Sequence, residues 1–378
     1  MIRQNRNILI VCLVALVNML GYGIVIPLLY AYSKKYGLTD FQNGLLFALF
    51  SICQFISTPI IGRMSDKFGR RPMLLVSIIG TALSFFVMAF APSVAFLFLA
   101  RALDGLTAGN VPVIFAVISD TTKPQERAKA FGYIGTAFSF GFIFGPAVAA
   151  LTVHLGENVP FIIAGVITCI SALLTYLYLP ESNQHMGEVQ EGKLFDFPKM
   201  WHTLFEPNVG PTFLISLLFF LAFACSIMYG FQPFTLNILK MTPSENALLF
   251  TMYGALGFLT QTLIVGRFSK KFGLKRAFST GLIWTGIALL AMYFSHTLLF
   301  FVAASALLAV FNSIVQTLIP TILSQEADAK SPGTIMGLNA SYHGIGMIFG
   351  PILGGAIAAY SVPLPFLVGS LLIGVCYI

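Results

Sequence analysis

Long apolar runs, each about as long as a helix that crosses a bilayer, follow one another along almost the whole chain. A membrane-spanning helix needs roughly 20 predominantly apolar residues. Of the 378 residues here, 57% are hydrophobic and only 9% are charged. The runs also lack the strict period-two alternation that is typical of membrane-spanning strands. The sequence therefore predicts an all-α polytopic membrane protein.

The apolar runs predict about twelve membrane-spanning helices joined by short polar turns. The helices are expected at 8–31, 43–62, 73–91, 95–119, 129–153, 159–179, 209–234, 245–266, 276–295, 298–324, 333–358 and 363–378. The polar stretch 180–208 is the one long connection, so we expect six-helix bundles at 1–179 and 209–378. The last expected helix is short or truncated and has no polar tail.

Lysine and arginine are distributed unevenly between the two sides of the expected membrane. The N-terminus and every second connection after it hold 17 of the 21 cations. Such an excess is typical of cytoplasmic connections, so both termini and the linker 180–208 are expected in the cytoplasm. The distribution of the +7 net charge matters more than its size, and no nucleic-acid partner is expected.

The most highly charged stretch, Gly62–Pro72, lies between two apolar runs. Burying its four cations and one carboxylate in hydrocarbon would cost roughly 2.5–3.5 kcal/mol each, so we expect a turn at the membrane surface. We expect Asp66 to approach the N-terminal end of the eleventh helix, near Gly333, where the helix dipole favours a carboxylate. The alternative is that the stretch only anchors the protein at the membrane surface by its positive charge. That alternative explains Lys67 and Arg71, but not Asp66.

The second half of the chain repeats motifs of the first half. Gly266–Arg276 aligns with Gly62–Pro72 at an offset of 204, and Gly346–Pro351 aligns with Gly141–Pro146 at an offset of 205. Two motifs at nearly the same offset indicate two parallel six-helix halves. Halves of this kind place a substrate path at their interface and alternate its access by rocking.

Asp104 is the only one of the 14 acidic residues that lies inside an expected span. Arg101 precedes it by three positions, which places the two side chains on one helix face. An intramembrane carboxylate is by default a functional candidate. We therefore expect Asp104 to bind a proton in one state and to be ionised beside Arg101 in another. The alternative is a permanent ion pair that fixes helix packing. His343 in the eleventh helix is a second proton-transfer candidate, with a packing histidine as its alternative.

Polar side chains within the spans are candidates for lining a substrate cavity, because a polar group that faces lipid has no partner. Hydrogen bonding between helices is the alternative for each of them. The abundant aromatic side chains would suit an amphipathic organic molecule. The cavity candidates are Asn18, Tyr22, Gln54, Asn110, Gln232, Asn312, Gln316 and Asn339.

Several kinds of chemistry lack their sequence signals. The five cysteines fall inside apolar runs without metal-ligand spacing, so no metal and no cofactor are expected. No nucleophile–base constellation is evident, so the chain is not expected to be an enzyme. A GxxxxGK[ST] phosphate-binding loop is also missing. Energy for transport is therefore expected from an ion gradient or from the gradient of the substrate.

Taken together, these motifs resemble the major facilitator superfamily, and within it the twelve-span drug:proton antiporters of the tetracycline-efflux branch. Gly62–Pro72 is similar to the family's loop motif between helices two and three. Arg101–Gly105 resembles the fourth-helix motif, whose arginine is implicated in proton transfer. Gly141–Pro146 resembles the fifth-helix antiporter motif. The resemblance also implies that Arg70 pairs with Asp120, and that the loop latches the cytoplasmic side of the protein.

Under this interpretation the site residues form three further groups. The proton-coupling residues are Asp104, Arg101 and His343. The cytoplasmic gate comprises Gly62, Asp66, Gly69, Arg70, Arg71 and Asp120. The antiporter-type motif comprises Gly141, Gly145, Pro146, Gly346, Gly350 and Pro351.

The chain departs from the tetracycline-efflux pattern at several positions. Ala149 and Ala150 stand where the fifth-helix motif normally ends in two glycines, whereas the second-half copy is complete. Asn18 stands where tetracycline pumps usually carry an aspartate, and the third and ninth spans lack acidic residues. These departures argue against tetracycline itself as the substrate.

The resemblance implies a monomeric, proton-coupled antiporter of the bacterial inner membrane that exports a small amphipathic organic compound. Its partners would be that compound, protons and the lipid bilayer. An importer, uniporter or symporter of a metabolite such as a sugar, organic acid or siderophore is the alternative, because importers share the loop motif. A non-transporting sensor on the same fold is a more remote alternative.

Overall fold

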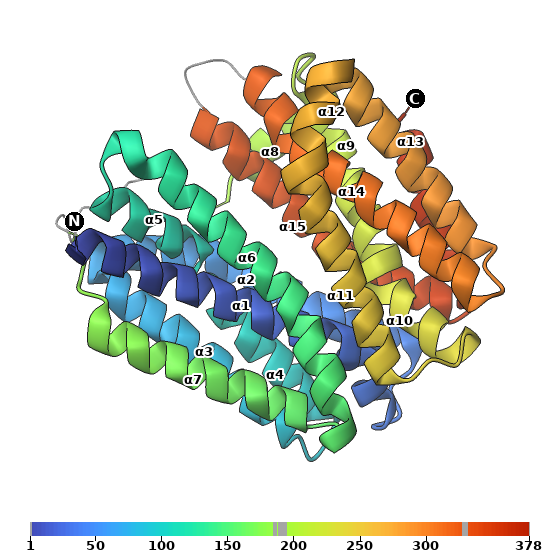
Figure 1. Ribbon diagram of the computed structural model, residues 1–378, viewed down its shortest axis with the longest axis horizontal. Helices are drawn as coiled ribbons and strands as arrows, with labels where there is room; N and C mark the ends of the chain where they lie inside the picture. The colour runs from blue at the N-terminus through green and yellow to red at the C-terminus, as the bar shows by residue number, and fades with distance from the viewer. Residues whose placement is uncertain (1, 184–186, 188–194, 327–331, 378) are drawn as a thin grey trace. The chain divides into compact units, whose positions relative to one another are not determined.

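The computed structural model describes residues 2–183, 187, 195–326 and 332–377, and the regular elements in these ranges are all helical (Figure 1). Nine helical runs within them are long and apolar enough to cross a membrane, and Leu364–Val375 forms a shorter apolar helix. A helix pairs its own backbone N–H and C=O groups, which is the condition that lipid imposes. The predicted all-α polytopic membrane fold is confirmed.

Five of the first six expected spans each correspond to one long helix. They are α1 (Ile2–Lys34), α2 (Asp40–Phe68), α3 (Arg70–Ala89), α6 (Pro124–Thr152), which the single turn η1 (Val153–Leu155) extends, and α7 (Val159–Tyr178). Helix α2 continues through most of the charged stretch that the sequence predicted as a turn. The turn itself is confined to Gly69, whose φ of 105° suits a residue without a side chain.

The fourth span is broken, whereas the sequence predicted one continuous helix at 95–119. It consists of α4 (Val94–Thr107) and α5 (Val111–Thr121). Pro112 explains the break, because it lacks a backbone N–H and its ring would clash with the carbonyl of the preceding turn. Hydroxyls of neighbouring helices satisfy carbonyls near the break: Ser57 donates to Gly105 O at 3.0 Å, and Ser77 donates to Thr107 O.

The second half of the chain contains more interruptions than the first. Its elements are α8 (Phe197–Thr203), α9 (Gly210–Phe223), η2 (Ala224–Gly230), α10 (Phe231–Pro233), η3 (Phe234–Ile238), α11 (Pro243–Leu259), η4 (Thr260–Ile264), α12 (Val265–Phe272), α13 (Leu274–Tyr293), α14 (Leu298–Glu326), α15 (Pro332–Ala358) and α16 (Leu364–Val375). The segments η2, η3 and η4 are π-helical. π-Helical turns of this kind often occur at functional sites.

The chain forms two compact units that exchange two short segments. Unit 1 comprises Met1–Gly37, Leu49–Leu194 and Pro243–Thr251, and unit 2 comprises Leu38–Ala48, Phe195–Thr242 and Met252–Ile378. The start of α2 therefore packs within unit 2, where the Tyr229 hydroxyl donates to the backbone oxygen of Asp40 at 2.6 Å. The start of α11 packs within unit 1, where Asn246 donates to the backbone oxygen of Pro27 at 2.7 Å.

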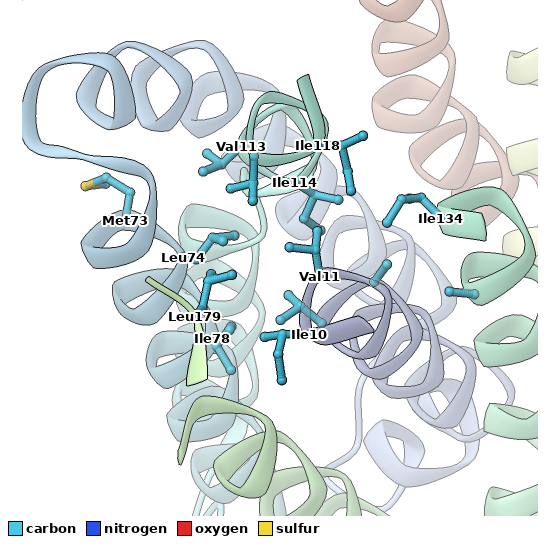
Figure 2. Packing of buried hydrophobic residues seen from close by; sticks show 14 of the residues in the cluster. Ile10, Val11, Met73, Leu74, Ile78, Val113, Ile114, Ile118, Ile134 and Leu179 are labelled. Carbon is cyan, nitrogen blue, oxygen red and sulfur yellow. The ribbon is translucent and has the colours of Figure 1, made fainter. Parts of the chain in front are cut away.

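The apolar core of unit 1 gathers side chains from α1, α3, α5 and α6, which lie together in Figure 2. Val11, Ile78 and Ile114 represent the first three of these helices in the cluster. Met73 from the first turn of α3 and Leu179 from just beyond α7 belong to the same core. The core thus holds three segments in place: the end of α2, the start of α3 and the beginning of the linker.

Candidate functional site

Arg101 and Asp104 form an enclosed ion pair on α4. The Nη1 atom of Arg101 lies 3.4 Å from Oδ2 of Asp104, and the two residues are 2% and 9% exposed. One long contact of this kind is weaker than the bidentate pairing that arginine and a carboxylate can form. The Nε atom of Arg101 has no hydrogen-bond partner among the described residues.

Aromatic and hydroxyl groups complete the surroundings of this pair. The guanidinium of Arg101 lies 4.4 Å from the ring centroid of Phe50, a distance suited to a cation–π interaction. Thr81 and Ser84 on α3 are neighbours of the Asp104 carboxylate. The Ser84 hydroxyl donates to the backbone oxygen of Thr81 at 2.7 Å, and Thr81 Oγ1 lies 3.4 Å from Thr107 Oγ1. Because a hydroxyl can donate to a carboxylate or accept from a carboxylic acid, such neighbours suit Asp104 in either protonation state.

The cavity candidates of unit 1 divide into a hydrogen-bonded pair and two further side chains. Asn18 Nδ2 on α1 donates to Oδ1 of Asn110 at 2.8 Å, beside the break in the fourth span. Gln54 Nε2 on α2 donates to the backbone oxygen of Ala108 at 3.5 Å. The ring of Tyr22 lies 5.8 Å from that of Phe50, and Phe50 in turn contacts Arg101. The four cavity candidates of unit 1 therefore lie near α4 and the break that follows it.

The candidates of unit 2 are more dispersed. Gln232 and Asn312 are buried, whereas Gln316 and Asn339 are half-buried. Asn339 Oδ1 accepts a hydrogen bond from the Ser216 hydroxyl at 2.8 Å, which joins α15 to α9. Asn339 therefore makes a hydrogen bond between two helices, and its cavity role stays a prediction.

His343 belongs to unit 2, whereas Arg101 and Asp104 belong to unit 1. Its imidazole packs edge to face against Phe220, with ring centroids 4.1 Å apart. His343 is exposed, and its role in proton transfer stays a prediction.

Three of the predicted gate residues lie in one cluster. Arg70 Nη1 lies 2.6 Å from Asp66 Oδ1, and Arg70 Nε lies 3.2 Å from Asp120 Oδ2 at the end of α5. Arg70 Nη1 also donates to the Ser65 hydroxyl at 2.7 Å. We call Asp66, Arg70 and Asp120 the gate cluster. Gly333, the expected neighbour of Asp66, falls outside the residues whose surroundings the structure describes.

The remaining gate residues frame this cluster. Arg71 donates to the backbone oxygen of Tyr176 on α7, and its guanidinium lies 5.2 Å from the ring centroid of Tyr176. Gly62 lies within α2, where an added Cβ would be 3.9 Å from Pro112. Gly69 supplies the positive-φ turn described above.

Residues Glu181, Ser182 and Asn183 contact the gate cluster, although the sequence interpretation assigned them no role. Ser182 Oγ donates to Asp120 Oδ2 at 3.3 Å. Glu181 accepts hydrogen bonds from backbone N–H groups of Arg70 and of its own loop. The sequence shows that these residues directly follow the sixth span. It does not show which helices they contact, because those helices are distant in sequence.

The antiporter-type glycines make the same kind of contact in both halves. A Cβ at Gly145 on α6 would lie 2.5 Å from the backbone oxygen of Leu20 on α1. A Cβ at Gly346 on α15 would lie 2.8 Å from the backbone nitrogen of Leu221 on α9. Gly141 and Gly350 are equally crowded, against Leu16 and Ala224, and each copy ends in a proline within its helix, Pro146 and Pro351. Small residues thus permit close helix packing.

Groups of three or more His, Cys, Asp or Glu side chains that could hold a metal ion are not found among the residues that the structure describes. The site therefore consists of an ion pair, amide and hydroxyl groups, and aromatic rings. Groups of these kinds can bind and orient an organic molecule, and a carboxylate can also exchange protons.

Comparison with known proteins shows the family to which this chain belongs. The sequence profile of the Major Facilitator Superfamily matches residues 11–235 and 212–378. Multidrug resistance protein 2 of Bacillus subtilis (strain 168) is 29% identical over 97% of this chain and 92% of its own length. The class B tetracycline resistance protein of Escherichia coli is 28% identical over 96% of this chain and 90% of its own length.

Solved structures agree at the level of the fold. An inward-facing, unoccupied bacterial homologue of the human lysosomal transporter Spinster superposes with a TM-score of 0.80 at 15% identity, covering 99% of this chain and 95% of that chain. The predicted family is therefore confirmed, and with it a multi-pass membrane protein with the transporter fold. This chain belongs to the major facilitator superfamily.

Proposed function

We propose that this protein is a proton-coupled antiporter that exports small amphipathic organic compounds across the bacterial inner membrane. Its halves, 1–179 and 209–378, would be joined by a cytoplasmic linker at 180–208 and would alternate access by rocking. Both termini would lie in the cytoplasm. Relatives that are named as multidrug and tetracycline resistance proteins support drug export.

The observation that carries the proposal is the enclosed Arg101–Asp104 pair. Asp104 has one long contact to the guanidinium and two hydroxyl neighbours, so it can lose its charge without losing all of its partners. When Asp104 is protonated, Arg101 retains the ring of Phe50. Proton uptake and release at Asp104 would therefore change the charge of this enclosed site while leaving the pair in place.

The substrate would contact the polar and aromatic groups near this pair. Asn18 and Asn110 offer amide groups, and Tyr22 adds an aromatic surface with a hydroxyl. These neutral groups favour an organic molecule with hydrogen-bonding and apolar parts over a strongly charged chelate. Gln54, Gln232, Asn312, Gln316 and Asn339 are the further cavity residues that we propose.

The gate cluster would control cytoplasmic access. In it one guanidinium contacts two carboxylates from different helices, so a movement of α2 or α5 would separate at least one pair. Such a cluster is suited to two discrete arrangements rather than gradual deformation.

The test is uptake into inside-out vesicles of cells that lack other efflux pumps, with tetracycline, a quinolone and a lipophilic cationic dye as probes. An exporter concentrates at least one probe inside these vesicles, and a protonophore abolishes the accumulation. Asp104→Asn should abolish accumulation, and Glu126→Gln, which removes a carboxylate at the start of α6, serves as the control. Accumulation by Asp104→Asn equal to wild type would refute the coupling role of Asp104.

The same vesicles discriminate the alternatives. An importer accumulates its substrate in right-side-out vesicles and not in inside-out ones. A non-transporting sensor moves none of the probes and tolerates both Asp104→Asn and Arg101→Ala.

A further inference from the structure

The turn at Gly69 leaves two helix ends without local caps. The backbone N–H groups at the start of α3 and the carbonyls at the end of α2 have no partners within their own helices. Gly69 has no side chain with which to cap α3. The groups that satisfy these ends come from the beginning of the linker, more than a hundred residues away in sequence.

The carboxylate of Glu181 caps the start of α3. Its Oε1 accepts from the backbone N–H of Arg70 at 2.9 Å, and its Oε2 accepts from that of Arg71 at 3.0 Å. Oε1 also accepts from the backbone N–H groups of Ser182 at 2.9 Å and Asn183 at 2.8 Å. A carboxylate at a helix N-terminus is favoured both by these bonds and by the helix dipole.

Asn183 caps the other side of the turn. Its Nδ2 donates to the backbone oxygen of Asp66 at 2.8 Å, in the last turn of α2. Met73 and Leu179, close to these polar contacts in sequence, are both buried in the core of unit 1 (Figure 2). The linker thus begins beside the core of unit 1 and contacts α2, α3 and α5, the three helices that carry the gate cluster.

Gly69 is shaped for this contact. A Cβ at Gly69 would lie 2.5 Å from Oε2 of Glu181, so any larger residue would displace the carboxylate. Gly273 holds the equivalent position in the second half, with a φ of 82°, but its Cβ would meet nothing within 4 Å. We call the contact between the Glu181 carboxylate and the start of α3 the clamp; among the described residues, no carboxylate lies beside Gly273 in this way.

We propose that Glu181 is a positioning residue of the cytoplasmic gate. Its carboxylate ties the start of the linker to α3 and holds Arg70 where the guanidinium meets Asp66 and Asp120. This inference rests on the proposed function only for its effect on transport; the clamp itself can be tested without any substrate.

Hydrogen–deuterium exchange of the full-length purified protein tests the clamp directly, because four of the donors are backbone amides. In Glu181→Ala, exchange at Arg70 and Arg71 should accelerate by about tenfold, the factor expected for losing one net capping interaction. Glu181→Gln, which keeps one acceptor oxygen, should give a smaller increase. Amides at the start of α13 should be unchanged. Wild-type exchange rates in Glu181→Ala would overturn the clamp.

The two glycines provide a matched comparison. Gly69→Ala and Gly273→Ala both place a side chain at positive φ, but only the first displaces a carboxylate. Gly69→Ala should therefore accelerate exchange at Ser182 and Asn183, and Gly273→Ala should not. If both variants accelerated exchange at Ser182 and Asn183 equally, displacement of the carboxylate would not be the cause, and the proposal would be overturned.

Transport measures the positioning role. With the probe that wild type accumulates best, Glu181→Gln should lower kcat while KM and the response to protonophore stay the same. Accelerated exchange with an unchanged kcat would reduce Glu181 to a purely structural role. If wild type moved no probe, the proposed function would fail, and the exchange measurements would still decide the clamp.

Discussion

The guanidinium of Arg70 bridges two carboxylates that approach it from different helices, Asp66 at 2.6 Å and Asp120 at 3.2 Å. Asp66 belongs to the same helical stretch of α2 that leads into the turn, whereas Asp120 ends α5. One cation therefore connects the second and fourth spans at the end where the linker begins. Local sequence spacing accounts for the first contact, and only folding creates the second.

The Arg70–Asp120 contact should be energetically coupled but modest. The side chains are 13% and 27% exposed, and partly exposed pairs contribute about 1 kcal/mol or less. A double-mutant cycle with Arg70→Ala and Asp120→Ala, measured by chemical unfolding in detergent, should give a coupling free energy of that size. Each single variant should also lose transport. Additive effects on stability would show that the two side chains do not interact.

The enclosed Arg101–Asp104 pair should be costly to break on one side. Asp104→Leu leaves Arg101 charged and enclosed, and removing one partner of a buried pair costs about 3–5 kcal/mol of unfolding free energy. The double variant Arg101→Met/Asp104→Leu should recover most of that loss but should not recover transport. Unfolding in detergent and vesicle uptake measure the two effects separately. A double variant that transports would remove the pair from the coupling mechanism.

The Asn18–Asn110 hydrogen bond should stabilise the broken fourth span. Asn110 is almost fully buried and bonds to Asn18 at 2.8 Å. Asn18→Leu leaves Asn110 without this donor, at a cost of about 1–3 kcal/mol of unfolding free energy. Replacing both residues by Leu should cost less than the sum of the single changes. Thermal unfolding of the three variants provides the comparison, and strict additivity would contradict a direct bond.

The glycines of α6 should differ sharply in their tolerance of a methyl group. Gly145 is pressed against the backbone of α1, whereas a Cβ at Gly135 on the same helix would meet nothing within 4 Å. Gly135→Ala should raise the unfolding free energy by up to about 1 kcal/mol through helix propensity. Gly145→Ala should lower it by about 1–3 kcal/mol, since the helices must separate. A destabilising effect of Gly135→Ala would show that backbone flexibility, not contact, governs these positions.

Most of the transmembrane architecture could be predicted from the sequence, because lipid leaves the backbone few alternatives. Apolar runs of the required length must form helices there, and the described helices cover the expected spans. The break at Pro112 escaped prediction because the apolar run continues across it. The proline was visible, but proline within a span is often tolerated, and the outcome depended on whether neighbouring helices could supply groups such as Ser57 and Ser77.

The candidate site was predictable only in part. Arg101 and Asp104 lie three positions apart on one helix, so their pairing follows from helical geometry alone. Phe50, Thr81 and Ser84 were not singled out, since ordinary aromatic and hydroxyl residues are frequent in such a chain. Their position beside the pair depends on how α2 and α3 pack against α4.

The sequence by itself determined that this chain spans a membrane, that its halves repeat, and that one carboxylate lies inside a span. These conclusions need only the cost of placing polar groups in hydrocarbon and the period of a helix. The tertiary structure alone decided that Glu181 caps α3. It also places Asp120 against Arg70, a contact that only the family resemblance had implied. These contacts join residues far apart in the chain, and hydrogen bonds between such residues form only where packing brings a donor to an acceptor. No local pattern encodes that distance.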